Sequence, residues 1–196
     1  IGELTAAREH LERSVSFYDA DQHQTYRSLL RLDPGIYSLG QGARVLCLLG
    51  YPDLARQKFQ KASSLSQETG DPRSIAFTQV VGTCVFTNLR ECEHVRKLME
   101  DCIAHCTEHD IGDDQAWTCL WGGWAMAEQG AITEGIALIQ KNLATRRLLG
   151  AMISHTEFLT LLAQALGKAG RIEEGLAALA EAMELASLMG EGYFRA

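Results

Sequence analysis

The stretch GAITEGIALIQKNLATRRLLG, residues 130–150, decides the fold, because its pattern returns forty residues later as GRIEEGLAALAEAMELASLMG, residues 170–190. Both stretches begin and end at glycine. One series of such positions holds Gly50, Arg90, Gly130 and Gly170, and a second holds Gly70, Asp110, Gly150 and Gly190. Most of these residues follow apolar side chains at helical spacing, where a left-handed glycine ends a helix. The sequence therefore predicts a repeated unit of two helices joined by short turns.

The turns between the two helices of a unit read GYPD from residue 50, RECE from 90, GAIT from 130 and GRIE from 170. Their last residues are Asp53, Glu93, Thr133 and Glu173, which we expect to cap free amides or to meet the positive end of the helix dipole. The first helices are predicted over 35–49, 73–88, 113–129 and 152–169, and the second helices over 53–69, 92–109, 132–149 and 172–189. A preceding helix is expected over residues 2–18.

These helices predict one repeat array over residues 1–196. Its units are 1–18, 35–70, 73–110, 113–150 and 152–190, and residues 19–34 form an extended connection or a short extra helix. Because the sequence starts at Ile1 and a further helix is expected to begin at Tyr193, we interpret the chain as a fragment of a larger protein.

The composition of the chain argues against some classes of binding partner and indicates the state of its cysteines. The formal net charge of −7 argues against binding to nucleic acid or to an anionic membrane surface. No apolar run approaches the length of a membrane span. We expect the six cysteines to be reduced thiols in a cytoplasmic protein, most of them buried as small apolar side chains.

Residues at the same position of successive units follow a pattern that resembles a known repeat family. Five residues after each turn glycine, small residues prevail, namely Ala55, Gly135 and Gly175, with Val95 as the larger exception. This pattern resembles the tetratricopeptide (TPR) repeat. The forty-residue unit, with LLGYPDLA at 48–55 and WAMAEQG at 124–130, is similar to the helical region found C-terminal to the ATPase module in bacterial adenylate cyclases and helix-turn-helix regulators. The resemblance implies an all-α, right-handed α-α superhelix and a non-catalytic interaction or sensing module of a multidomain signalling protein.

In such an array the first helices of the units line a concave surface. Residues at equivalent positions of those helices predict a partner-binding groove made of Tyr37, Arg44, Phe77, Asn88, Trp117, Trp124, Glu128 and Lys168. The alternative is that the aromatic residues only pack between helices. Because Trp117, Trp121 and Trp124 share one helix face, at least one of them is expected to be partly exposed.

Signals for catalysis are weak. Residues 105–109, HCTEH, match the H-x-x-E-H pattern of zinc proteases, and Cys102 lies one turn earlier. The positions equivalent to His105 include Leu65 and Leu185, which favours ordinary packing. The sequence has neither a P-loop nor a G-x-S-x-G nucleophile elbow. We therefore predict no catalytic residue, no cofactor and no metal site.

Three functions remain open at this point. The leading one is an interaction or sensing module, whose partner is a protein, a peptide or another domain of the same polypeptide. The second is a structural spacer or a self-association surface, with a homodimer formed through the ends of the array. The third is a zinc-binding protein whose ligands are Cys102, His105 and His109.

Overall fold

The computed structural model describes residues 3–30 and 32–190, and within these ranges it contains helices and no strand. The helices are α1 (Leu4–Phe17), the 3-10 helix η1 (Ala20–Gln22), α2 (His23–Leu29), α3 (Pro34–Leu48), α4 (Pro52–Thr69), α5 (Pro72–Asn88), α6 (Cys92–His109), α7 (Gly112–Glu128), α8 (Ile132–Leu148), α9 (His155–Lys168) and α10 (Ile172–Met189). The predicted all-α class is confirmed. The helix expected from Tyr193 lies outside the described residues.

Residues with a left-handed backbone conformation separate the helices at the predicted interval of twenty residues. The glycines at 50, 70, 130, 150, 170 and 190 all have positive φ. Arg90 and Asp110, which replace glycine in the series, adopt the same region with φ of 61° and 55°. A residue with a side chain is strained there, so the repeat geometry dictates the backbone even where the sequence lacks glycine.

The predicted caps differ from the observed ones. No side-chain cap hydrogen bond is present at the starts of α4, α6, α8 and α10. Asp53 and Glu93 instead lie within the first turns, where a carboxylate meets the positive end of the helix dipole. Side-chain caps occur at two first helices, α3 and α5: Asp33 accepts from the amides of Gly35 and Ile36, and Asp71 accepts from that of Ser74.

Residues 19–30 form η1 and α2 between α1 and α3. The buried Asp33 ties this insertion to the start of α3. Its Oδ2 accepts from the hydroxyl of Tyr18 at 3.1 Å and lies 2.7 Å from Nδ1 of His23. Gly35 makes room for the Tyr18 ring, since an added Cβ would lie 2.7 Å from it. The short extra helix is thus held by a polar cluster.

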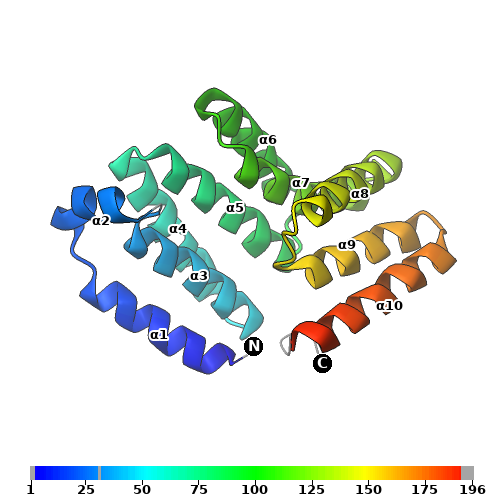
Figure 1. Cartoon of the computed structure of the whole chain (residues 1–196), viewed down its shortest axis with the longest axis horizontal. Coiled ribbons are helices and arrows are strands. Elements are labelled where there is room, and N and C mark those ends of the chain that lie inside the picture. The colour runs from blue at the N-terminus through cyan, green and yellow to red at the C-terminus, as the bar shows by residue number, and fades with distance from the viewer. Residues whose placement is uncertain (1–2, 31, 191–196) are drawn as a thin grey trace.

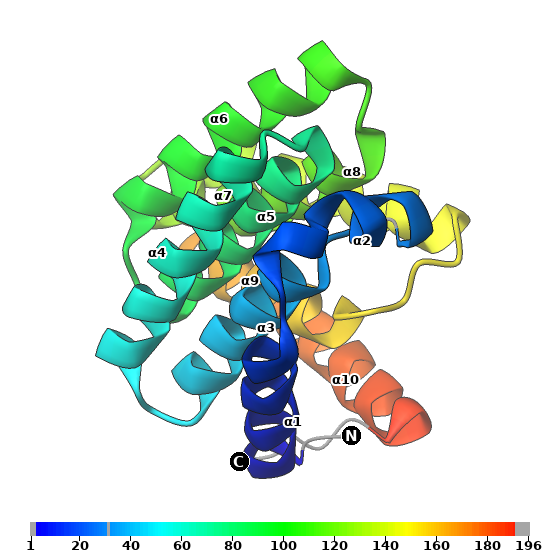
Figure 2. The ribbon, with the colours of Figure 1, turned by 90° about the vertical axis from the view of Figure 1, so that its left-hand side faces the viewer.

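The units form two layers. Helices α3, α5, α7 and α9 contact one another in sequence and form an inner row, while α4, α6 and α8 each pack outside two consecutive members of that row. Helix α1 covers α3, and α10 packs on α9. The array curls into an arc in which α3 and α9 lie on opposite arms (Figure 1), and Figure 2 shows it from the side of α1. None of the helices over the described residues has the length and apolar character needed to cross a membrane.

Glycines allow the closest backbone approach, which occurs between α7 and α8. A Cβ on Gly135 would lie 2.3 Å from the carbonyl oxygen of Gly123, and a Cβ on Gly123 would lie 2.8 Å from that of Gly135. Only a residue without a side chain fits at this crossing. The small residue expected five positions after the turn is therefore a packing requirement here.

Candidate binding site on the concave face

Three equivalent aromatic residues from successive inner helices gather on the concave face. Tyr37 of α3 stacks on Phe77 of α5 with ring centroids 5.6 Å apart. Trp117 of α7 lies half-buried beside them, with the Arg146 guanidinium carbon 3.8 Å from its ring centroid. Tyr37 is 47% exposed, so a ligand on this face would meet an aromatic surface.

These aromatics line a pocket of about 270 Å³. Its walls come from α3, α5 and α7 and from the loop before α9. The lining residues are Tyr37, Gln41, Arg44, Phe77, Val80, Val81, Cys84, Asp114, Trp117, Trp121 and Ile153. Apolar side chains form most of the surface and a few polar groups lie among them, which is the usual composition of a binding pocket.

The buried carboxylate of Glu157, in the first turn of α9, joins four helices beside this pocket. Its Oε1 accepts from Nε1 of Trp121 at 2.9 Å and lies 3.8 Å from Sγ of Cys84. Its Oε2 lies 3.5 Å from Nη2 of Arg44. A buried carboxylate needs donors of this kind to offset its lost hydration, so Glu157 fixes how closely the inner helices approach one another.

A second polar junction lies further along α9. The amide oxygen of Gln164 accepts from Nε1 of Trp124 at 3.1 Å and from Nη1 of Arg90 at 3.0 Å. The Arg90 guanidinium also lies 5.2 Å from the Trp124 ring centroid. The Arg44–Glu157 and Arg90–Gln164 contacts join units that are not neighbours in sequence, so they close the arc.

Only some of the predicted groove residues line the pocket. The four that do so are Tyr37, Arg44, Phe77 and Trp117. Trp124 is fully buried, so it offers no surface to a ligand, although Trp117 provides the partly exposed tryptophan that was expected. Asn88 donates to the carbonyl of Cys84, and Lys168 pairs with Glu128 at 3.1 Å. Asn88, Glu128 and Lys168 do not line this pocket.

Several lining residues were not predicted. Trp121, Asp114 and Ile153 belong to the pocket, and Glu157 stands behind it. Glu157 occupies the position equivalent to Tyr37, Phe77 and Trp117. A carboxylate in an otherwise aromatic series was the signal that could have singled it out.

Burial raises the pKa of all six cysteine thiols and so favours their protonated form. All six are free. Burial raises the pKa of Cys84 to about 12 and that of Cys47 to about 11, and it also raises the pKa of Cys102. Thiols of this kind remain protonated at neutral pH, whereas the thiolate is the reactive form.

The zinc-protease pattern does not form a metal cluster. Cys102 and Cys106 are buried in the core with their sulfurs 3.6 Å apart. His105 instead points to the carbonyl oxygen of Pro72, 2.9 Å from its Nε2, and its ring lies 4.5 Å from that of His109. No group of three potential ligands converges within residues 3–30 and 32–190.

Comparisons with known proteins support the fold. No protein-family model matches the sequence, and no curated protein matches it. A solved structure described as a Podosopora anserina kinesin light chain with nearly identical TPR-like repeats matches with a TM-score of 0.56 and 16% sequence identity. The match covers 96% of this chain and 89% of the other. The chain therefore has a TPR-like helical repeat fold, a right-handed α-α superhelix.

Proposed function

We propose that this chain is a non-catalytic protein-interaction module, which binds an extended peptide segment of a partner at the concave pocket. The observation that carries the proposal is the partly open aromatic surface of Tyr37, Phe77 and Trp117, contributed by three successive inner helices. An apolar side chain of the peptide would insert there, and Arg44 would orient the peptide backbone or a carboxylate. Buried aromatic anchors with a few polar contacts supply most of the affinity in such interfaces.

The wider context of the proposal rests on the sequence resemblance. We infer that the array belongs to a larger cytoplasmic signalling protein of bacteria, an ATPase, adenylate cyclase or transcription regulator. In that setting the occupied pocket would pass a signal to an attached domain. The partner is another protein or another domain of the same polypeptide.

A pull-down from bacterial lysate tests the proposal with two exposed pocket positions. Tyr37 and Ile153 are 47% and 71% exposed, so Tyr37→Ala with Ile153→Ser should leave the fold intact, as circular dichroism would verify. Tyr51→Ala is the matched control, because Tyr51 is 46% exposed and does not line the pocket. A partner kept by the unchanged chain and by Tyr51→Ala, and lost by the double variant, supports the proposal. Equal retention by all three contradicts it.

The outer face of α10 favours a second candidate, a self-association surface. Leu176, Leu179 and Met183 are 56%, 39% and 75% exposed. The equivalent residues of α8, which are Ile136, Ile139 and Leu143, are buried in the core beside α9. An uncovered helix face of this kind invites association. Sedimentation of the unchanged chain and of Met183→Lys would decide: a dimer that the substitution abolishes supports this candidate, and a monomer at all concentrations removes it.

A further inference from the structure

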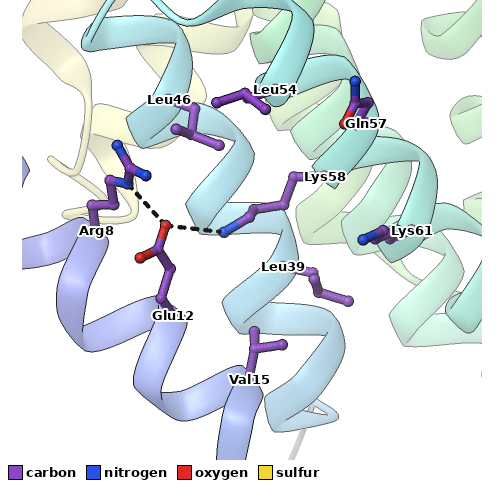
Figure 3. A pocket seen from close by; sticks show the side chains of 9 residues that line it. All are labelled: Arg8, Glu12, Val15, Leu39, Leu46, Leu54, Gln57, Lys58 and Lys61. Atoms are coloured by element: carbon purple, nitrogen blue, oxygen red, sulfur yellow. Dashed lines mark hydrogen bonds and ion pairs between the residues drawn. The ribbon is translucent and has the colours of Figure 1, made fainter.

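A groove of about 350 Å³ lies on the outside of the array between α1 and α4, with α3 as its floor. Figure 3 shows its side chains. Val15, Leu39, Leu46 and Leu54 form the apolar surface, and Arg8, Glu12, Lys58 and Lys61 supply the charges. We call this the α1/α4 groove. None of its residues belongs to the concave pocket.

Lys58 breaks the repeat pattern in this groove. The equivalent positions of the later units hold Leu98, Leu138 and Ala178. Its aliphatic stem passes over Gly42, where an added Cβ would lie 2.8 Å from Cδ of Lys58. The side chain reaches from α4 across α3 toward α1 (Figure 3). A lysine thus occupies a packing position, and its ammonium group projects into the groove.

The charges inside the groove do not balance. Glu12 is the one carboxylate among the lining residues, and Nε of Arg8 already binds its Oε1 at 2.8 Å. Nζ of Lys58 lies 3.9 Å from the same oxygen. Burial lowers the pKa of Lys58, Glu12 opposes this effect, and the nearby cations Arg8 and Lys61 lower the pKa further. Three cations therefore face one carboxylate in a chain whose formal net charge is −7.

The neighbouring groove between α4 and α6 provides an internal comparison. It has a volume of about 400 Å³ and is lined in part by Arg56, Glu91, Lys97, Leu98 and Asp101. Leu98 and Asp101 stand at the positions of Lys58 and Lys61. There, two cations from arginine and lysine face two carboxylates. The α4/α6 groove, which His94 also lines, therefore lacks the threefold excess of lysine and arginine over carboxylates found in the α1/α4 groove.

We propose that the α1/α4 groove docks an acidic, apolar peptide segment of a partner protein, whose apolar side chains cover the leucines while its carboxylates meet Lys58 and Lys61. Charge complementarity of this kind selects a partner and its orientation. A nucleic acid fits poorly, because a phosphate backbone requires an extended row of cations and leaves an apolar floor uncovered. The site is separate from the concave pocket, so each can fail without the other.

Fluorescence anisotropy with defined probes tests this proposal. The probe is a labelled amphipathic peptide built from leucine and glutamate, and the reference peptides replace every glutamate with glutamine or with lysine. We expect the glutamate peptide to bind at least tenfold more tightly than either reference, and the difference should shrink as salt rises. Lys58→Met with Lys61→Gln should weaken binding of the glutamate peptide at least tenfold.

Lys97→Gln with Arg56→Gln is the matched control, since it removes two charges from the neighbouring groove. It should leave binding within twofold of the unchanged chain. The proposal is overturned if this control loses binding equally, if the lysine peptide binds as well as the glutamate peptide, or if no probe binds at millimolar concentration. Equal competition by inorganic polyphosphate would also overturn it, because the site would then be a plain cationic patch. Circular dichroism verifies that both variants remain folded.

Discussion

At the scale of single residues, Glu157 matters most to the shape of the concave face. Its carboxylate receives the indole N–H of Trp121 and faces Arg44 and Cys84, so side chains from three other helices depend on one acceptor on α9. Such a network stabilises only while every member keeps a partner, because an unpaired buried donor or charge is costly.

Replacement of Glu157 tests this dependence. Glu157→Leu should lower the free energy of unfolding by about 2–4 kcal/mol, since Trp121 loses its acceptor and Arg44 loses its counter-charge. Glu157→Gln keeps an acceptor for Trp121 and should lower it by about half as much. Urea unfolding followed by tryptophan fluorescence measures both variants. A Glu157→Leu protein as stable as the parent would show that the network contributes nothing.

His155 gives the molecule a dependence on pH. Burial lowers its pKa, nearby Arg147 and Arg146 lower it further, and Glu181 partly opposes them. Between the folded pKa and the ordinary value of about 6.5, the unfolded chain binds more protons than the folded chain, so stability rises with pH. We expect the unfolding free energy to fall as pH drops below about 6.5, and His155→Leu to flatten that slope. Urea titrations between pH 5 and 8 measure it, and an unchanged slope in the variant would contradict the assignment.

At the scale of elements, most helix ends followed from the sequence because a left-handed residue stops a helix wherever it occurs. The prediction was weakest at α9, which begins at His155, three residues after the expected start. Ser154 precedes it with φ of 57°, a conformation that the sequence did not signal. Tertiary contacts hold that loop: the Arg146 side chain donates to the Ile153 carbonyl at 2.8 Å.

Arg90 tests the balance between backbone strain and side-chain contact at a turn. Arg90→Gly removes strain of about 1–2 kcal/mol but also loses the contacts to Gln164 and Trp124, so its stability should stay near that of the parent. Arg90→Ala keeps the strain and loses the contacts, and it should lower the unfolding free energy by about 1 kcal/mol. Thermal unfolding ranks the three proteins. If the Arg90→Ala protein is as stable as the Arg90→Gly protein, backbone strain at position 90 does not contribute to stability.

At the scale of the whole molecule, we expect contacts between distant units to set the curvature of the array. Neighbouring units pack through the repeated inner and outer helices, but that packing alone permits a range of openings. Arg44 and Arg90 each contact α9 from units that are far from it in sequence. Both the width of the concave face and the shape of its pocket depend on these bridges.

Removal of the bridges should open the arc. Arg44→Ala with Arg90→Ala is expected to increase the radius of gyration in small-angle X-ray scattering while the helix content stays constant. Arg56→Ala serves as the control, because Arg56 pairs with Glu91 between adjacent units. An equal increase in both proteins, or none in the double variant, would show that local packing alone fixes the curvature.

The sequence by itself determined the helices and their pairing, because helix ends and apolar spacing are local properties that recur in every unit. It placed Tyr37, Phe77 and Trp117 at equivalent positions. Only the tertiary structure decided that Trp124 is buried, that Glu157 joins four helices and that Arg44 and Arg90 bridge the arc to α9. Those outcomes depend on small rotations between units, which accumulate along the array and bring together residues more than a hundred positions apart.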